Sequence, residues 1–136
     1  MALIETRLNG RTFLELARRP NIGEMPDMVL EICRALIPLG RLGIVHADLK
    51  PANLLLCDDV SGGVRLLDFG SARSRARPTL PGEDEGTDAA TPPYAAPELM
   101  RGWNIDPRAD QYSLGITLRH VCPSLGISGG VKRIIP

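Results

Sequence analysis

The chain has 136 residues, of which 16 are basic and 16 acidic, so its formal net charge is zero at pH 7. This length suits one modest domain, and the balanced charge argues against nucleic acid or a membrane surface as a partner. No apolar run approaches the ~18 residues of a membrane span, and the three cysteines are widely separated, which indicates reduced thiols in a cytoplasmic protein.

The amino-terminal part contains short elements separated by turn formers. Ala2–Ile4 is a short apolar run, and Asn9-Gly10 after it marks a turn. Phe13–Ala17 then carries a brief helical face that ends before Pro20 and Asn21. The sequence therefore predicts a strand, a turn and a short helix in this region.

A longer helix is expected from Pro26 to about Arg41. Apolar residues recur there at helical spacing and give one buried face, made of Met28, Val29, Ile32, Ala35, Leu36 and Leu39. Asp27 suits the first turn of this helix, and Gly40 or Gly43 suits its end. Pro38 has no amide hydrogen, so we expect it to kink the helix or to end it about one turn early.

Two apolar runs, Leu54–Cys57 and Val64–Leu67, flank a polar segment that contains Gly62-Gly63. This pattern is typical of a β-hairpin. Because a hairpin returns the chain to its starting end, Asn53 at its entry and Asp68 at its exit are expected to lie close together.

The carboxy-terminal half contains one further regular element. Residues 71–93 are polar, contain four prolines and show no periodicity, which indicates a mobile loop rather than a packed element. Ala109–Val121 is apolar enough for a buried helix. We therefore expect one domain over residues 1–122, followed by an irregular tail, 123–136.

Residues 46–53 and 68–70 carry groups suited to phosphoryl transfer. This reaction needs a carboxylate to accept the proton of the attacking hydroxyl, oxygen ligands to hold Mg²⁺ against the phosphates, and a cation to offset the developing charge. The chain supplies these groups, in the same order, as Asp48, the pair Asn53 and Asp68, and Lys50.

His46–Asn53 and Asp68-Phe69-Gly70 together resemble the catalytic and magnesium loops of eukaryotic-type protein kinases. Two further motifs follow in the order of that family. Thr91–Glu98 resembles the end of an activation segment, and Asp110–Gly115 resembles the start of the helix beneath the catalytic loop. The resemblance implies a partial α+β kinase fold: a mostly helical carboxy-lobe core with a short β-hairpin, and an amino lobe that is largely absent.

The resemblance also implies the chemical roles of four side chains. Asp48 would be the catalytic base, and Lys50 would steady the γ-phosphate of ATP. Asn53 and Asp68 would hold Mg²⁺, and through it the nucleotide. ATP and Mg²⁺ are therefore the expected cofactors.

The adenine site is implied by the same alignment. Leu55 resembles the residue that packs under adenine, and Glu5 and Arg7 would offer backbone groups to it. Ile4 would take the gatekeeper position, which makes the first strand the last one of the amino lobe.

Other residues resemble the parts of a kinase that support the reaction. His46 and Phe69 look like the carboxy-lobe half of the stacked hydrophobic spine. Asp110 resembles the buried aspartate that accepts catalytic-loop amides, and Glu98 resembles a glutamate that pairs with a later arginine. Thr91 resembles a threonine that bonds the catalytic aspartate and lysine.

Two details concern specificity and regulation. Lys50 followed by Pro51, together with Thr91, resembles the serine/threonine-directed branch, so the expected substrate is a protein serine or threonine. Ala47 stands where most family members carry arginine. That arginine pairs with a phosphorylated activation-loop residue, so we expect a kinase that is not switched by this ion pair.

The 136 residues contain no glycine-rich phosphate loop, no lysine–glutamate pair of the amino lobe and no later carboxy-lobe helices. We therefore expect an active parent protein, weak activity of the chain alone, and self-association through exposed core. One alternative is a truncated pseudokinase that acts as a binding or scaffold module. Another is a small-molecule phosphotransferase of the aminoglycoside-kinase type, against which Asp68–Gly70, Ala96–Glu98 and Asp110–Gly115 argue.

Overall fold

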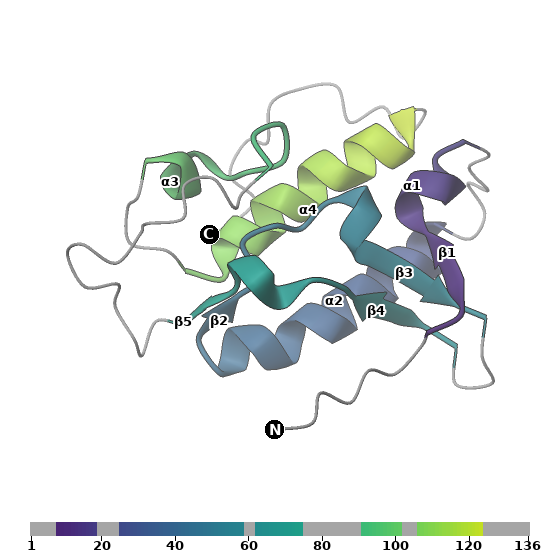
Figure 1. Cartoon of the computed structure of the whole chain (residues 1–136), viewed down its shortest axis with the longest axis horizontal. Coiled ribbons are helices and arrows are strands. Elements are labelled where there is room, and N and C mark those ends of the chain that lie inside the picture. The colour runs from purple at the N-terminus through teal and green to yellow at the C-terminus, as the bar shows by residue number, and fades with distance from the viewer. Residues whose placement is uncertain (1–7, 19–24, 59–61, 75–90, 102–105, 124–136) are drawn as a thin grey trace.

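A computed structural model describes residues 8–18, 25–58, 62–74, 91–101 and 106–123 (Figure 1). Within them none of the helices is long and apolar enough to cross a membrane. The described elements mix helices with short antiparallel strands, which confirms the expected α+β class. In chain order they are β1 (Gly10–Thr12), α1 (Phe13–Leu16), α2 (Met25–Arg41), β2 (Ile44–Val45), η2 (Pro51–Asn53), β3 (Leu54–Cys57), β4 (Val64–Leu66), η3 (Phe69–Ser71), β5 (Arg73–Ser74), α3 (Pro97–Met100) and α4 (Arg108–Val121).

The predicted hairpin is confirmed, with its second strand one residue shorter than expected. Strands β3 and β4 pair antiparallel, with Leu54 opposite Leu66 and Leu56 opposite Val64. Strand β1 adds to the other edge of β3, so the order in this sheet is β1-β3-β4. Helix α2 packs against β4 (Figure 1).

The predicted turn at Asn9-Gly10 is wrong, because Gly10 begins strand β1 and pairs with Cys57. A Cβ atom on Gly10 would lie only 2.2 Å from the carbonyl oxygen of Leu56. The glycine is therefore needed for the close approach of two backbones rather than for a change of chain direction.

Helix α2 continues through Pro38, so the prediction of an early end is wrong. Pro38 lies in the last turn, where its missing amide removes one hydrogen bond, and its own carbonyl still accepts from the amide of Leu42 at 3.1 Å. The helix ends before Gly43, whose φ of 66° is the left-handed conformation that glycine adopts most easily. Gly40 remains inside the helix.

The expected loop from residue 71 onward begins instead with a short strand. Arg73 and Ser74 form β5, which pairs antiparallel with β2 through Val45 and Ile44. Two polar residues without periodicity become a strand here because they satisfy the backbone groups of β2. Residues 75–90 lie outside the described part of the chain, and so do most of the tail and the positions Ile4, Glu5 and Arg7.

Two clusters of buried apolar residues form the core, and the loop after β2 links them. Leu49 belongs to the first cluster, which joins α1, α2, the hairpin and α4. Ala47 belongs to the second cluster, together with Val45, Ala96, Leu99 and Ala109. The loop that carries the predicted catalytic residues is therefore fixed on both sides by packing.

Self-association through exposed core would need large apolar side chains at the surface of the chain. The strongly exposed large apolar side chains are Leu8, Leu14, Leu30, Ile37, Leu42, Phe69 and Met100, and none of them lies on α4. Self-association of the chain stays a prediction.

Candidate active site

The loop after β2 is held by a buried carboxylate of α4. Asp110, 3% exposed, accepts hydrogen bonds from the backbone amides of His46 at 2.8 Å and Ala47 at 3.0 Å. Ala47 has a φ of 67°, a left-handed conformation that is unusual for a residue with a Cβ atom. Burial raises the pKa of Asp110, and the two amide hydrogen bonds and the His46 side chain oppose this rise only in part.

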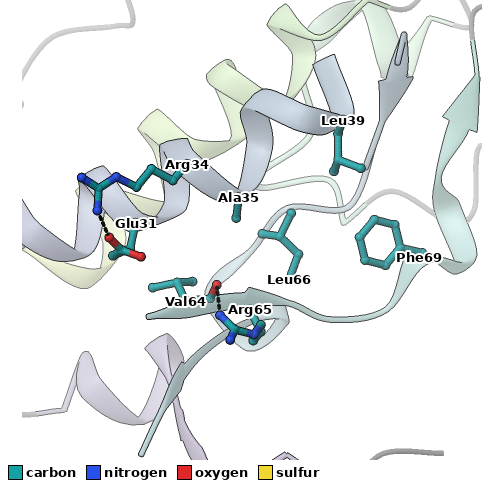
Figure 2. Close-up of a pocket in the computed structure, with 8 residues that line it drawn as sticks. All are labelled: Glu31, Arg34, Ala35, Leu39, Val64, Arg65, Leu66 and Phe69. Carbon is teal, nitrogen blue, oxygen red and sulfur yellow. Dashed lines mark hydrogen bonds and ion pairs between the residues drawn. The ribbon is translucent and has the colours of Figure 1, made fainter. Parts of the chain in front are cut away.

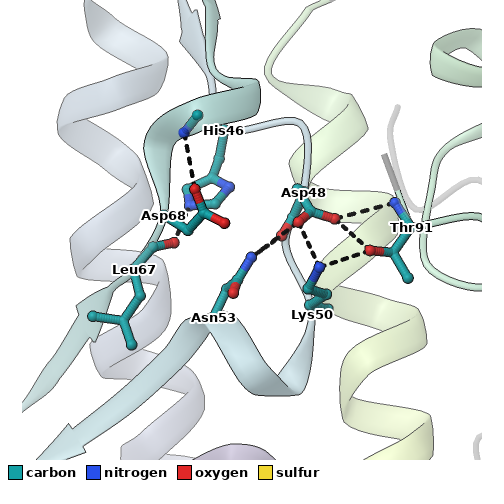
Figure 3. A network of polar contacts seen from close by, with 8 residues as sticks. His46, Asp48, Lys50, Asn53, Leu67, Asp68 and Thr91 are labelled. Carbon is teal, nitrogen blue, oxygen red and sulfur yellow. Dashed lines mark hydrogen bonds and ion pairs between the residues drawn. The ribbon is translucent and has the colours of Figure 1, made fainter. Parts of the chain in front are cut away.

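Asp48 is the centre of a network of polar contacts (Figure 3). Its Oδ2 accepts from the Lys50 ammonium at 2.7 Å, and its Oδ1 accepts from the hydroxyl of Thr91 at 2.7 Å and from the Thr91 amide at 3.1 Å. The Lys50 ammonium also donates to the Thr91 hydroxyl at 2.8 Å. Thr91 thus meets Lys50, which is 41 positions away in the sequence, and Asp48, which is 43 positions away, at one carboxylate.

The network keeps Asp48 ionised although the side chain is largely buried. Burial by itself raises the pKa of Asp48. Hydrogen bonds from Lys50 and Thr91, together with the positive charge of Lys50, outweigh burial and lower the pKa below its ordinary value. At neutral pH the site therefore contains a carboxylate whose acceptor positions are shared among Lys50, Thr91 and Asn53.

Asn53 is oriented by the same aspartate. Its amide nitrogen donates to the backbone oxygen of Asp48 at 2.9 Å and to Oδ2 at 3.1 Å. Because the nitrogen is committed to Asp48, the amide oxygen on the other branch is the atom that can act as a ligand. The 3₁₀ turn η2, which begins at Pro51, positions Asn53 at the entry of β3.

Asp68 follows the other strand of the hairpin. The amide of Leu67 donates to the backbone oxygen of Asn53 at 2.9 Å, which brings Asp68, the next residue, to the same end of the hairpin as Asn53 (Figure 3). Asp68 is exposed, has a φ of 60°, and accepts the Gly70 amide on Oδ1 at 3.1 Å. The predicted meeting of the two hairpin ends is confirmed.

Asn53 and Asp68 suit Mg²⁺ only in combination with other oxygen ligands. Among the described residues no group of three or more His, Cys, Asp or Glu side chains could hold a metal ion by itself. Mg²⁺ is bound in many phosphoryl-transfer sites by one or two carboxylate or amide oxygens together with substrate phosphates and water. The two residues fit that kind of site.

Leu55 is the one predicted adenine contact that the described residues include. It is 7% exposed and belongs to neither core cluster, whereas its neighbour Leu54 belongs to the first. Successive residues of a strand point to opposite faces. Leu55 therefore lies on the face of β3 that is turned away from the core.

The predicted supporting residues also have defined neighbours. The buried His46 ring lies 4.8 Å from the Phe69 ring, and its Nε2 lies 3.0 Å from the backbone oxygen of Leu67. Glu98 is half-buried and acts electrostatically on the guanidinium of Arg108. The carboxylate of Glu98 is therefore close to a cation of the described part of the chain.

Sequence reasoning missed the contact between Tyr94 and His120. The Tyr94 hydroxyl lies 2.5 Å from His120 Nδ1, and the two rings stack with an interplanar angle of 3° and a centroid distance of 5.8 Å. The two residues are 26 positions apart, and neither lies in a pattern that predicts the other.

A hollow of about 400 Å³ lies between α2 and strand β4, apart from the Asp48 network (Figure 2). Its apolar wall includes the exposed ring of Phe69, which connects it to the end of the hairpin. The remaining lining residues are Glu31, Arg34, Ala35, Leu39, Val64, Arg65 and Leu66. No predicted catalytic or metal-binding side chain lines this hollow.

Comparison with known proteins agrees with this geometry. The sequence matches the family "Protein kinase domain" over residues 2–124. "Ribosomal protein S6 kinase alpha-4" of Mus musculus is 47% identical over 122 residues, which cover 85% of this chain and 15% of the relative. "Serine/threonine-protein kinase PknL" of Mycobacterium tuberculosis (strain ATCC 25618 / H37Rv) is 43% identical over 76 residues, or 56% of this chain and 18% of the relative.

A third relative, "Probable serine/threonine-protein kinase CE0033" of Corynebacterium efficiens, is 30% identical over 119 residues, or 85% of this chain and 18% of the relative. The chain thus spans less than a fifth of the length of each of these three relatives. The family match covers most of the chain, and the relatives are named as serine/threonine or S6 kinases. The chain belongs to the protein kinase family.

Proposed function

We propose that this chain supplies the catalytic loop and the magnesium ligands of an ATP-dependent protein kinase that phosphorylates serine or threonine. The observation that carries the proposal is the network around Asp48. A carboxylate with a lowered pKa lies next to a lysine, and Asn53 binds the same carboxylate. These are the groups that phosphoryl transfer to a hydroxyl requires.

Asp48 would orient the substrate hydroxyl and accept its proton. Its lowered pKa makes it a weak base before the reaction, so its first role is to align the hydroxyl oxygen toward the γ-phosphorus. The proton moves to the carboxylate as the new oxygen–phosphorus bond forms. The bond between the γ-phosphorus and the bridging oxygen of ADP breaks in the same displacement.

Lys50 would bind the transferred phosphoryl group. An ammonium group has three hydrogens to donate, and Asp48 and Thr91 accept two of them. The third hydrogen can bond a γ-phosphate oxygen, which places positive charge where negative charge develops.

Asn53 and Asp68 would bind Mg²⁺ through the amide oxygen and the carboxylate. The metal, when bound, offsets the charge of the phosphates during transfer. Leu55 would pack against adenine from the face of β3 that is turned away from the core, and Glu5 and Arg7 would supply backbone contacts. Thr91, which binds both Asp48 and Lys50, supports the serine/threonine assignment.

A scaffold role without catalysis is the second candidate. The presence of all the catalytic-loop side chains in one connected network favours catalysis over this alternative. The 136 residues lack the glycine-rich loop and the lysine–glutamate pair, so by themselves they would bind ATP weakly and transfer phosphate slowly. Protein substrates and a cytoplasmic location remain part of the proposal.

The test is Mg²⁺-dependent phosphorylation of serine, threonine and tyrosine peptides, by the chain and by a longer protein that contains it. Transfer to serine and threonine is expected in the longer protein, and Asp48→Asn should lower its rate by about 10²–10⁴-fold. Asp106→Asn changes an aspartate that pairs with Arg108, away from the Asp48 network, and serves as the control. Equal rates for the two variants, or no transfer by the longer protein, would leave the scaffold role.

A further inference from the structure

The turn that follows Thr91 is anchored to α4 by a pair of side chains. The backbone oxygen of Thr91 accepts the amides of Tyr94 at 2.9 Å and Ala95 at 3.1 Å, so the chain folds back immediately after its contact with Asp48. The Tyr94 hydroxyl then meets His120 in the last turn of α4, and the rings stack. A continuous series of contacts thus runs from α4 through Tyr94 to Thr91.

We infer that Tyr94 and His120 form a positioning pair that holds Thr91 against Asp48 and Lys50. The inference rests on the proposed function for its catalytic meaning, but the contact itself is a property of the chain. Thr91 makes three contacts within the catalytic network, through its amide and its hydroxyl (Figure 3). Displacing it would remove one of the three residues that hold the Asp48 carboxylate, the others being Lys50 and Asn53.

The pair is poorly placed to stabilise the fold as a whole. His120 is exposed and Tyr94 is only half-buried, and a hydrogen bond in contact with water adds little to global stability. Ala95 and Ala96, the next residues, are already packed in the protein interior. The hydroxyl–imidazole bond is therefore better suited to fixing the position of the turn than to holding the domain together.

The Tyr94 phenol stays protonated at physiological pH, because burial raises its pKa and the charge of Lys50 offsets this rise only in part. The phenol O–H donates to His120 Nδ1 when the imidazole carries its hydrogen on Nε2, and the phenol oxygen accepts when the hydrogen is on Nδ1. The contact between the two side chains is therefore available in either tautomer.

Hydrogen exchange of the Thr91 amide, followed by NMR on the 136-residue chain, tests the inference without any need for activity. The Thr91 backbone amide donates to the Asp48 carboxylate, and the Asn53 backbone amide, which donates to the backbone oxygen of Lys50, serves as an internal reference. Tyr94→Phe keeps the ring but removes the hydroxyl. It should accelerate exchange of Thr91 by about three- to tenfold, the effect of losing one hydrogen bond, and leave Asn53 unchanged.

Three further variants separate positioning from general stability. Tyr112→Phe removes the same hydroxyl from the other tyrosine, on α4, and should change nothing. His120→Ala should act like Tyr94→Phe. His120→Asn keeps a hydrogen-bonding group close to the position of Nδ1, so it should restore Thr91 protection.

An unprotected Thr91 amide in the wild-type chain would overturn the inference. So would equal exchange in Tyr94→Phe and wild type, or equal acceleration of Thr91 and Asn53. If Thr91 is protected as expected but a longer protein transfers no phosphate, the proposed function fails and the positioning pair stands. If transfer occurs and Tyr94→Phe changes neither exchange nor kcat, the pair fails and the proposed function stands.

Discussion

Two aspartates hold the same loop, and they differ in what they bind. Asp110 is 3% exposed and accepts the backbone amides of His46 and Ala47. Asp48 is 6% exposed and interacts mainly with the side chains of Lys50 and Thr91. Burial raises the pKa of both, but only the pKa of Asp48 is lowered overall, because hydrogen bonds from Lys50 and Thr91 and the charge of Lys50 together outweigh burial there.

The difference separates a structural carboxylate from the one that we propose as the catalytic base. Backbone amides are fixed by the fold, so the Asp110 carboxylate holds the loop in one conformation. In that conformation Ala47 has its left-handed φ of 67°. Apart from the backbone amide of Thr91, the partners of Asp48 are side-chain groups on Lys50, Asn53 and Thr91, and side-chain groups can rearrange when a substrate enters. A buried charge with adaptable partners is suited to chemistry, and one with rigid partners is suited to architecture.

The largest expected effect is on stability, from Asp110→Ala. This change leaves two buried backbone amides without an acceptor, at roughly 1–3 kcal/mol each, so the free energy of unfolding should fall by about 2–6 kcal/mol. Asp48→Ala should lower the free energy of unfolding by less, because the Lys50 side chain is 25% exposed and its ammonium can then bind water. Urea unfolding of both variants measures the difference, and equal losses would remove the distinction between the two aspartates.

The second prediction is that the contributions of Asp48 and Asp110 to the free energy of unfolding depend on pH in opposite directions. The folded pKa of Asp48 lies below the ordinary value of 3.8, so its stabilisation is present above pH 3.8 and is lost as pH falls through the folded pKa. The folded pKa of Asp110 lies above 3.8, so its contribution is full below pH 3.8 and is lost as pH rises through the folded pKa.

Unfolding free energies measured across this range check the sign for each group. In Asp110→Asn the decline in stability with rising pH just above 3.8 should be reduced. In Asp48→Asn the decline toward acid below 3.8 should be reduced. Two variants that follow the wild-type profile in both windows would show that neither carboxylate titrates differently in the folded chain.

Lys50→Met should shift the pKa of Asp48 upward, in the direction of the raised pKa of Asp110. The substitution removes a hydrogen bond and a positive charge from the Asp48 carboxylate and leaves its burial in place, so the pKa of Asp48 should rise. An NMR titration of the Asp48 side-chain carbon measures the shift. Arg108→Met removes an exposed cation that pairs with Asp106 and should leave Asp48 unchanged. A titration of Asp48 that stays below 3.8 in Lys50→Met would mean that Thr91 alone offsets burial.

The smallest effect is expected for Ala47→Gly. The left-handed conformation costs an L-residue about 1–2 kcal/mol, and glycine removes that cost. Loss of one buried methyl, about 0.8 kcal/mol, and the greater freedom of unfolded glycine oppose the gain. Stability should therefore change by less than about 1 kcal/mol.

Ala96→Gly is the matched control for that variant. Ala96 is fully buried in the same cluster but has an ordinary φ of −63°, so no strain is relieved there. It should lose more stability than Ala47→Gly in the same unfolding experiment. The reverse order would indicate that the backbone at Ala47 is not strained by its side chain.

Local patterns were sufficient to predict the elements that form from neighbouring residues. The period of apolar side chains predicted α2, the apolar composition of Ala109–Val121 predicted α4, and the two apolar runs around Gly62-Gly63 predicted the hairpin. Motif order predicted that Asp48, Lys50 and Asn53 would gather, and the structure brings them together with Thr91. Their chemical roles remain proposals.

Features that depend on distant partners could not be predicted in this way. Gly10 looks like a turn residue until the carbonyl of Leu56 is placed beside it, and β5 exists only because β2 offers an edge. One local signal was available and was overlooked. Thr12 and Glu15 form a capping box at the start of α1, a spacing of threonine and glutamate that is visible in the sequence.

The hairpin has a consequence for how this part of the chain tolerates change. The paired strands and the bond from the Leu67 amide to the Asn53 carbonyl set the geometry at the base of the hairpin. Asp58 and Gly62, the described residues on either side of the turn, lie at the opposite end, beyond the paired residues Leu56 and Val64. An insertion or a peptide tag between Asp58 and Gly62 would therefore lengthen the chain without altering the distance in space between Asn53 and Asp68. This makes the turn between these two residues a suitable position for a spectroscopic label.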